Sequence, residues 1–339
     1  MTDLKVAVVG SGVIGLTTAI ELQKSIRNAN VSILSDGFNE DTTSWVAAGI
    51  FRPGGEFKGE NKEITQKWID DSWYYWKNIQ DSRYGAEAGV TELSGYTFSN
   101  RSENAVRNPY IEKLVPIYRP ATETELTSLC PQKWKFGSYY STLLIENSIY
   151  LPWATEKFKA DGGTVIHQRV DSLPSLGEKY DIVVNCAGLG SQTLCNDDEL
   201  VPVRGQVIKV DAPWLKMFFY ADSSTYIIPG FKSVTLGGCR ELGSYDLNPD
   251  KYVSLGIRER CENLVPSLKG AREIRTLVGL RPYRKSVRVE KETKICMCGK
   301  KVKIVHHYGH GGYGVTAAPG TSLHAVRLVK EMWAGNSKL

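Results

Sequence analysis

Gly10-Ser11-Gly12-Val13-Ile14-Gly15 is the stretch that decides the fold, because of what lies on either side of it. The preceding run, Leu4 to Val9, is apolar and rich in β-branched residues, which is typical of a buried parallel strand. The segment that follows, up to Lys24, carries apolar residues at helical spacing. A second apolar run, Val31 to Leu34, completes a βαβ unit of about 30 residues. The sequence therefore predicts an α/β fold that starts with a Rossmann-like domain.

The glycines of this stretch have separate tasks in a dinucleotide site. Gly10 makes the tight turn and Gly12 lets the backbone approach a pyrophosphate, while Gly15 lets the helix pack closely on the sheet. Val13 and Ile14 open the helix, whose N-terminus favours phosphate charge. Asp36 follows the second strand, where a carboxylate can accept hydrogen bonds from an adenosine ribose. This pattern alone does not separate NAD from FAD.

A second glycine-rich segment, Val305 to Thr316, favours FAD. We expect a helix to follow it from about Gly320 to Val329, and amides at a helix N-terminus can stabilise the negative charge that develops on a reduced flavin ring. Three histidines lie here, at positions 306, 307 and 310, without a neighbouring carboxylate or thiolate, so we predict no metal site. Cys296 and Cys298 are spaced too closely for the usual zinc knuckle.

The rest of the chain alternates between segments of two different compositions. Residues 49–136 are rich in aromatic and charged residues, whereas residues 180–188 again form a buried strand leading into a glycine turn. Strand-like runs at 207–210, 225–228 and 234–236, separated by turn residues, predict an antiparallel sheet. We therefore expect an FAD-binding domain made of residues 1–50, 138–199 and 285–339, interleaved with an α+β substrate domain made of residues 51–137 and 200–284.

Composition excludes several function classes. The net charge of +5 arises from 42 basic and 37 acidic residues spread along 339 positions, which does not indicate nucleic-acid binding. No apolar run is long enough to span a bilayer, so we expect no membrane partner. The seven cysteines are odd in number and irregularly spaced, which indicates a reducing intracellular compartment. Ser337-Lys338-Leu339 forms a C-terminal tripeptide of the kind read by the peroxisomal import receptor, so we expect the peroxisome matrix.

Several ordered segments carry a resemblance to a known family. Besides the stretch at Gly10, they are Thr42-Thr43, Val46 to Gly49, Val183 to Cys186, Arg204-Gly205-Gln206, Tyr226 to Gly230, Leu236-Gly237-Gly238, Gly279 to Pro282 and Tyr308 to Thr316. Over nearly its whole length the chain resembles the D-amino acid oxidase and D-aspartate oxidase family. The resemblance implies non-covalent FAD, a D-amino acid whose Cα hydride passes to flavin N5, and molecular oxygen as the final acceptor. The products would be a 2-oxo acid, ammonia and hydrogen peroxide.

The resemblance also implies roles for individual residues. Arg281 would clamp the substrate α-carboxylate, Tyr226 would donate a second hydrogen bond to it, and Gly312 would accept one from the amino group through its carbonyl. The remaining FAD contacts would come from Gly37, Thr42, Thr43, Ser44, Gly49, Ile50, Val170, Gly188, Gly311, Gly312, Tyr313, Gly314, Val315 and Thr316.

We expect the choice between acidic and neutral substrates to depend on Arg240, which stands where oxidases of neutral D-amino acids tend to have an apolar or aromatic residue. If it points inward, it meets the side-chain carboxylate of D-aspartate or D-glutamate; if outward, it would pair with Glu241 or Asp246. Arg52 is the next candidate, on the opposite wall. An acidic substrate is therefore the first hypothesis and a neutral D-amino acid the alternative, ahead of a flavin-binding protein without turnover or a nicotinamide dehydrogenase.

The family's active-site lid is where this chain departs most from the pattern. D-amino acid oxidases often carry a tyrosine four residues before the one matching Tyr226, and here that position is Asp222, while Tyr220 lies six before. The structure of the lid is thus left open by the sequence.

Overall fold

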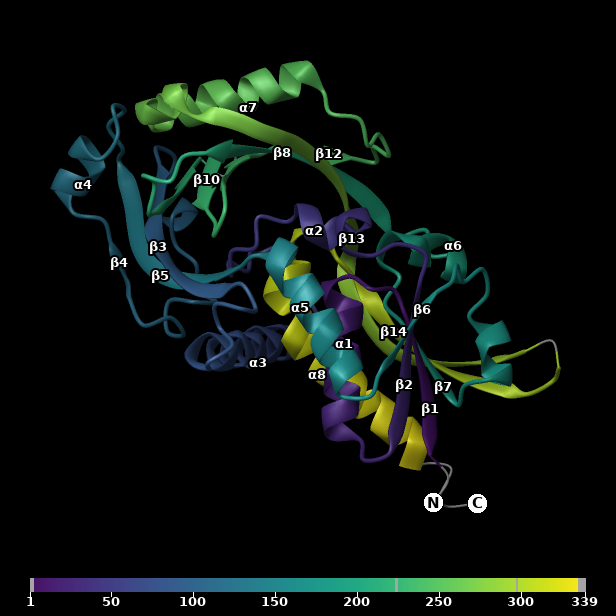
Figure 1. Cartoon of the computed structure of the whole chain (residues 1–339). Coiled ribbons are helices and arrows are strands. Elements are labelled where there is room, and N and C mark those ends of the chain that lie inside the picture. Colours follow the sequence, from purple (N-terminus) through teal and green to yellow (C-terminus); the bar gives the residue numbers. More distant parts are fainter. Residues whose placement is uncertain (1–2, 223–224, 297, 335–339) are drawn as a thin grey trace.

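The computed structural model describes residues 3–222, 225–296 and 298–334. Its strands are β1 (Leu4–Val9), β2 (Ala29–Ser35), β3 (Val90–Ser99), β4 (Tyr118–Pro120), β5 (Phe136–Ile145), β6 (Thr164–His167), β7 (Ile182–Asn185), β8 (Val201–Asp211), β9 (Phe218–Ala221), β10 (Thr225–Pro229), β11 (Val234–Gly237), β12 (Glu241–Leu242), β13 (Arg272–Ile295) and β14 (Lys301–His310). They join edge to edge in the order β4-β5-β3-β9-β10-β11-β8-β13-β14-β7-β1-β2-β6, and β12 pairs with β8. A parallel part and a mainly antiparallel part thus share one curved sheet (Figure 1).

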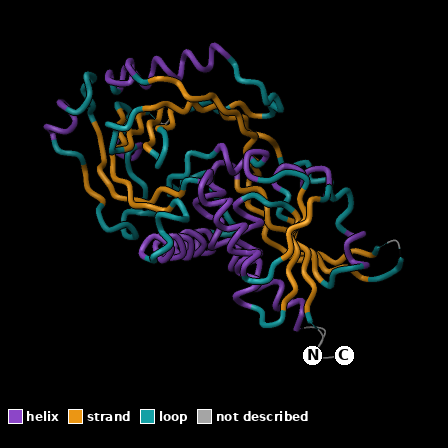
Figure 2. The backbone as a smooth tube through the Cα atoms, in the orientation of Figure 1, coloured by secondary structure: helices purple, strands orange, loops and turns teal. Residues whose placement is uncertain are grey.

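Helices cover both parts of this sheet, as Figure 2 shows. They are α1 (Val13–Ser25), α2 (Thr43–Val46), α3 (Lys62–Asp81), α4 (Glu123–Ser128), α5 (Asn147–Ala160), α6 (Ser191–Cys195), α7 (Lys251–Leu264) and α8 (Gly314–Ala334). Short 3-10 turns occur at η1 (Asn39–Asp41), η2 (Glu103–Ala105), η3 (Pro174–Glu178), η4 (Gly188–Gly190), η5 (Pro266–Gly270) and η6 (Gly311–Tyr313).

The parallel part contains the predicted βαβ unit. Strand β1 pairs in parallel with β2 on one side and β7 on the other, and β14 continues the parallel pairing beyond β7. Helix α1 lies against α5 and α8, and the buried face between them and the strands is aliphatic. The prediction of a Rossmann-like α/β domain is confirmed by this arrangement.

The antiparallel part contains the three strand-like runs that the sequence indicates. They lie in β8, β10 and β11, which pair in antiparallel register. Helix α7 lies on the outside of this part (Figure 1), where Ile257 and Cys261 are buried against the strands. The long strand β13 connects the two parts, because residues 272–283 pair with β8 and residues 288–295 pair with β14. The expected domain boundaries at 137/138 and 284/285 fall inside β5 and β13, which are continuous strands. The division of the chain into two domains therefore stays a prediction.

Helix α8 begins earlier than expected, at Gly314 rather than near Gly320. Pro319 looks like a helix breaker, since it leaves the carbonyl four residues before it, that of Val315, without a donor. The indole Nε1 of Trp76 on α3 donates to that carbonyl at 3.1 Å. A contact from a distant helix therefore lets the turn before Pro319 stay helical, and this contact is not visible in the local sequence.

Candidate active site

A cavity of about 800 Å³ lies where the parallel and antiparallel parts of the sheet meet. All site residues expected from the sequence line it, except Gly15. At one end are Gly10, Gly12, Val13, Ile14, Asp36, Gly37, Thr42, Thr43, Ser44, Val170 and Gly188. Toward the other end are Gly49, Ile50, Arg52, Tyr226, Arg240, Arg281, Gly311, Gly312, Tyr313, Gly314, Val315 and Thr316.

The first end is built from the turn between β1 and α1. Gly10 has a φ of +106°, and its N–H donates to the Leu34 carbonyl of β2 at 2.8 Å. Gly15 does not reach the cavity because it packs behind this turn, where a Cβ would lie 1.9 Å from the Gly10 carbonyl oxygen. The N–H of Val13 donates to Ser44 Oγ at 3.0 Å. Because Gly12, Val13 and Ile14 also line the cavity, the N-terminus of α1 faces a region that can hold a phosphate.

Asp36 follows β2 and is 65% exposed, with Arg169 4.0 Å away. Its neighbour Gly37 is fixed through its carbonyl, which accepts hydrogen bonds from the hydroxyls of Ser11 and Ser35. The Asp36 carboxylate therefore remains available to accept hydrogen bonds from a ribose.

The N-terminus of α8 lines the cavity. Strand β14 ends at His310, the 3-10 turn η6 follows, and α8 then runs on for 21 residues. The first half of the glycine-rich segment is therefore strand and not loop. Burial lowers the pKa of His310 to about 3 and that of His307 well below its ordinary value, so both imidazoles are neutral. No group of His, Cys, Asp and Glu side chains in the described ranges is arranged to hold a metal ion.

Arg281 and Tyr226 lie side by side at the far end. Arg281 Nη1 donates to the carbonyls of Cys239 at 3.2 Å and Arg204 at 3.3 Å, and no carboxylate of residues 3–222, 225–296 or 298–334 pairs with it. Burial raises the pKa of the Tyr226 phenol, and the adjacent Arg281 guanidinium only partly offsets this. A guanidinium and a protonated phenol together can bind one carboxylate.

Glycines make room for both of these side chains. A Cβ at Gly205 would lie 2.2 Å from the terminal nitrogens of Arg281, and Cβ atoms at Gly237 and Gly238 would lie within 2.1 and 2.5 Å of the Tyr226 ring. Gly312 lies beside the same arginine, since a Cβ there would be 3.5 Å from its Cδ. The sequence did not predict that Gly205 makes room for Arg281, because the residues around Gly205 carry no information about a side chain that is distant in the chain.

Arg240 lines the cavity, but it is already paired. Its Nη2 donates to Glu56 Oε2 in a short ion pair, and the two side chains are 55% and 50% exposed. The alternative of a pair with Glu241 or Asp246 is wrong. The buried Arg204 donates to the Glu241 carboxylate at 2.9 Å and to the Asp246 carbonyl at 2.8 Å. Glu56 was not expected, and no signal in its surrounding turn residues could have indicated this contact.

Arg52 lies deeper in the same cavity. Its guanidinium carbon is 4.3 Å from the centroid of the Tyr220 ring, and its Nε is buried without a hydrogen-bond partner. The Tyr220 ring is in turn 5.6 Å from that of Tyr226, centroid to centroid. The cavity wall at Arg52 is therefore basic.

The segment expected to act as a lid has a different arrangement. Asp222 turns away toward β3, where its Oδ1 accepts from Ser99 Oγ at 2.8 Å. Tyr220 lines the cavity instead. Residues 223 and 224 lie outside the described ranges, so the remainder of this segment has no structural account.

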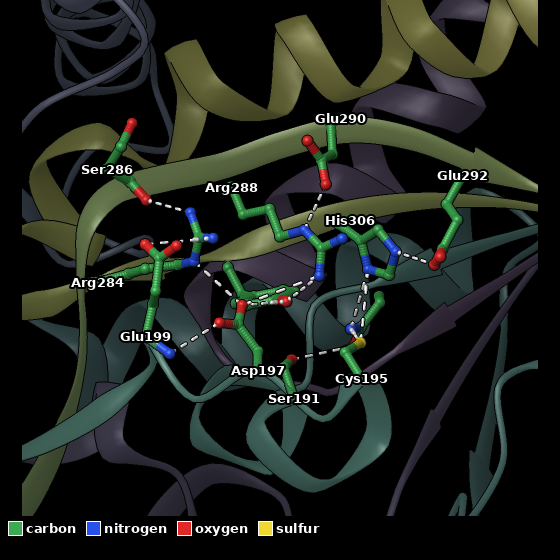
Figure 3. A network of polar contacts seen from close by, with 12 residues as sticks. Ser191, Cys195, Asp197, Glu199, Arg284, Ser286, Arg288, Glu290, Glu292 and His306 are labelled. Atoms are coloured by element: carbon green, nitrogen blue, oxygen red, sulfur yellow. Dashed lines mark hydrogen bonds and ion pairs between the residues drawn. The ribbon is translucent and has the colours of Figure 1, made fainter.

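A buried polar network lies next to the cavity and ties β13 and β14 to the loop after α6 (Figure 3). Asp197 Oδ2 accepts from the Tyr308 hydroxyl at 2.7 Å and from Arg284 Nε at 3.0 Å, and Arg288 Nη1 is 3.8 Å away. Although burial opposes it, the Tyr308 hydroxyl and Arg284 keep the pKa of Asp197 below its ordinary value. Tyr308 itself lines the cavity, so this network fixes part of its wall.

His306 extends the network on the other side of Arg288, as Figure 3 shows. Its Nε2 is 2.9 Å from Glu292 Oε2, and since a carboxylate only accepts, Nε2 carries the proton. Burial lowers the pKa of His306 despite this hydrogen bond, which favours the neutral ring. Its Nδ1 then faces Asn185 Nδ2 at 3.5 Å and Cys195 Sγ at 3.7 Å as an acceptor.

The sequence profile of the family described as FAD dependent oxidoreductase matches residues 5–328. The chain belongs to this family. D-aspartate oxidase from Homo sapiens is 41% identical over 332 residues, covering 98% of this chain and 96% of the relative. D-amino-acid oxidase from Streptomyces coelicolor is 35% identical over 331 residues, covering 96% and 97%. This FAD-dependent oxidoreductase therefore matches its relatives over nearly their full length.

Solved structures share the fold at low sequence identity. Glycine oxidase from Geobacillus kaustophilus has a TM-score of 0.79 at 19% identity, covering 97% of this chain and 95% of that one. L-alpha-glycerophosphate oxidase from Mycoplasma pneumoniae, solved with FAD bound, has a TM-score of 0.73 at 17% identity, covering 97% and 95%. The FAD-dependent oxidoreductase fold is thus common to both. No described helix of this chain is long and apolar enough to cross a membrane.

Proposed function

We propose that this enzyme oxidises D-aspartate and D-glutamate with molecular oxygen, releasing a 2-oxo acid, ammonia and hydrogen peroxide. One observation carries the proposal: the cavity that joins the dinucleotide turn to Arg281 and Tyr226 is also lined by two further arginines, Arg52 and the Glu56-paired Arg240. A substrate with two carboxylates matches this charge distribution, and the 41% identical relative is a D-aspartate oxidase.

The residues at the first end of the cavity fit FAD. Gly10, Gly12 and the N-terminus of α1 would hold the pyrophosphate, and Asp36 the ribose. The segment from Gly311 to Thr316 would place backbone amides beside the flavin ring. When bound, FAD would take up the substrate Cα hydrogen as a hydride, which carries both electrons of the oxidation. Non-covalent binding is favoured because burial raises the pKa of Cys186, a thiol at the cavity wall, to about 12.

The protein's own part in the reaction is to bind and orient the substrate. Arg281 and Tyr226 would hold the α-carboxylate, and the Gly312 carbonyl would accept a hydrogen bond from the amino group. The neutral, buried His307 and His310 do not offer an exposed base. The substrate would therefore react with its amine already deprotonated.

A neutral D-amino acid is the second candidate. The Glu56 carboxylate compensates the charge of Arg240, which lowers the penalty for placing an uncharged side chain beside it. Peroxide release from D-aspartate, D-glutamate, D-alanine, D-methionine and the L-enantiomers tests both candidates. Acidic D-amino acids should give the highest kcat/KM, and a preference for D-alanine or D-methionine would favour the second candidate.

We further propose import into the peroxisome through Ser337, Lys338 and Leu339, which lie outside the described residues. A peroxide-forming reaction is consistent with that location. A fusion carrying a fluorescent protein at its N-terminus should form peroxisomal puncta, because the import receptor reads a free C-terminus. Puncta that persist after deletion of Leu339 would contradict the proposal.

A further inference from the structure

Cys195, His306 and Glu292 follow one another along one side of the buried network (Figure 3). Cys195 Sγ is 3.7 Å from His306 Nδ1, and Nε2 of the same ring is 2.9 Å from Glu292 Oε2. A thiol, an imidazole and a carboxylate in this order match a nucleophile, its general base and the group that orients the base. None of the three lines the cavity, so the proposed oxidation of a D-amino acid does not use them.

The protonation states of the three groups suit a proton transfer from sulfur to nitrogen. The Glu292 carboxylate only accepts, so it keeps the His306 proton on Nε2 and leaves Nδ1 as an acceptor beside the thiol. Burial raises the pKa of the Cys195 thiol and lowers that of the His306 imidazole, which favours the neutral form of both. Because the thiolate is the reactive form, this thiol depends on a neighbouring base when it reacts.

Other neighbours stabilise the negative charge that would develop on the sulfur. Asn185 Nδ2 donates to Cys195 Sγ at 3.2 Å. The Asn185 side chain is itself held in place, because its Oδ1 accepts from Ser191 Oγ at 3.2 Å. A hydrogen bond from Tyr308 and the positive charge of Arg288 also lower the pKa of the Cys195 thiol, although burial outweighs them.

The comparison with two other cysteines shows what is particular to Cys195. Cys186 Sγ is 3.8 Å from His307 Nδ1, but this thiol is buried and His307 Nε2 has no hydrogen-bond partner in the described part of the chain. Cys298 is exposed, and its side chain contacts Cys296 rather than a histidine. Cys195 combines partial exposure with an imidazole acceptor and a carboxylate behind that imidazole.

We infer that Cys195 is a site of oxidation by hydrogen peroxide, with His306 as its general base and Glu292 as the group that orients the base. The sulfur attacks one peroxide oxygen, so an S–O bond forms and the O–O bond breaks. The thiol proton passes to His306 Nδ1 and then to the departing hydroxide, which leaves as water. The sulfur loses two electrons to the peroxide, and Cys195 becomes a sulfenic acid. The inference goes beyond the proposed function, which would supply the peroxide.

The test adds hydrogen peroxide to the FAD-loaded enzyme together with dimedone, which traps sulfenic acids, and follows each labelled cysteine by mass spectrometry. Cys195 should be labelled faster than the exposed Cys298, and the buried Cys186 should stay unlabelled. His306→Gln should slow the labelling of Cys195 about 100-fold, the lower end of the effect of a positioned general base, and should leave the labelling of Cys298 unchanged.

Glu292→Gln tests the same arrangement at a side chain that is 33% exposed and therefore easier to replace without loss of the fold. It removes the charge that orients His306, so it should slow the labelling of Cys195 by less than His306→Gln does. Glu331→Gln is the matched control, because it removes an exposed carboxylate of α8 that pairs with Lys291. This control should label like the wild type. Should His306→Gln not retain flavin, the comparison of the two glutamate variants decides.

Labelling of Cys195 that is no faster than that of Cys298, or that Glu292→Gln leaves unchanged, would overturn the inference. A second arm replaces the added peroxide with D-aspartate in air, and catalase should abolish the labelling there. If added peroxide labels Cys195 but D-aspartate does not, the result contradicts the proposed function and leaves the oxidation site standing.

Discussion

Gly205 and Arg281 are packed so closely that a Cβ at position 205 would lie 2.2 Å from both terminal nitrogens of the arginine. Gly205→Ala should therefore displace the guanidinium while leaving its charge in place. A misplacement of about 1 Å can lower kcat by roughly 100-fold, so we expect kcat/KM to fall by about that factor for every D-amino acid. Peroxide release measured across acidic and neutral substrates checks the prediction.

Gly270→Ala is the control for this experiment, because a Cβ there meets no atom within 4 Å. Both variants should keep the flavin absorbance of the wild type. Normal activity of Gly205→Ala would mean that Arg281 has a different position during turnover.

Part of this site could be predicted because its signals are local. The Gly10 turn, its flanking strand and its helix lie within one short segment, and the periodicities of that segment are those of the elements it forms. The alternating runs at 207–210, 225–228 and 234–236 likewise carry a local strand signal, and they lie in β8, β10 and β11. Arg281 and Tyr226 were found through the resemblance of their segments, not through the physical pattern of the sequence.

The features that sequence reasoning missed depend on contacts between distant segments. Glu56 reaches Arg240 across 184 positions, and the Trp76 indole supports α8 across 239. The local pattern of apolar residues predicts neither contact. The start of α8 and the pairing of Arg240 could therefore be seen only in three dimensions.

The pH dependence of kcat/KM should show no step caused by the titration of a histidine. Burial lowers the pKa of His310 to about 3 and that of His307 well below its ordinary value, and it raises the pKa of Tyr220 and Tyr226. None of these groups changes charge between about pH 6 and 9. The value of kcat/KM for D-aspartate should rise with pH as the substrate ammonium loses its proton. A plateau entered near pH 6.5, the ordinary range of histidine, would contradict the assignment of neutral, non-titrating imidazoles.

The network of Figure 3 predicts a stability change at Asp197. This carboxylate is 6% exposed and faces Arg284 and Arg288, so Asp197→Asn leaves two guanidiniums without their shared anion. Because Arg284 keeps Glu199 at 3.4 Å and Arg288 keeps Glu290 at 2.6 Å, we expect a loss of about 1–3 kcal/mol of unfolding free energy, the cost of a buried hydrogen-bonding group left without its partner. Urea denaturation at neutral pH measures the change, with the adjacent exposed Asp198→Asn as the control.

The same variant has a predictable pH signature. Because the folded pKa of Asp197 is below its ordinary value, its stabilising contribution is fully present above the unfolded pKa of about 3.9 and is lost as the pH falls through the folded value. The difference in stability between wild type and Asp197→Asn should therefore shrink in acid. A difference that stays constant down to about pH 2 would show that charge is not its origin.

The proposed function requires this chain to hold FAD and to use it to oxidise an acidic D-amino acid. The most direct measurement is the absorbance of the purified yellow enzyme under anaerobic conditions after addition of D-aspartate or L-aspartate. We expect D-aspartate to bleach the oxidised flavin band, air to restore it with release of hydrogen peroxide, and L-aspartate to leave it unchanged. A colourless protein that FAD cannot reconstitute, or a flavin band that D-aspartate does not bleach, would contradict the account.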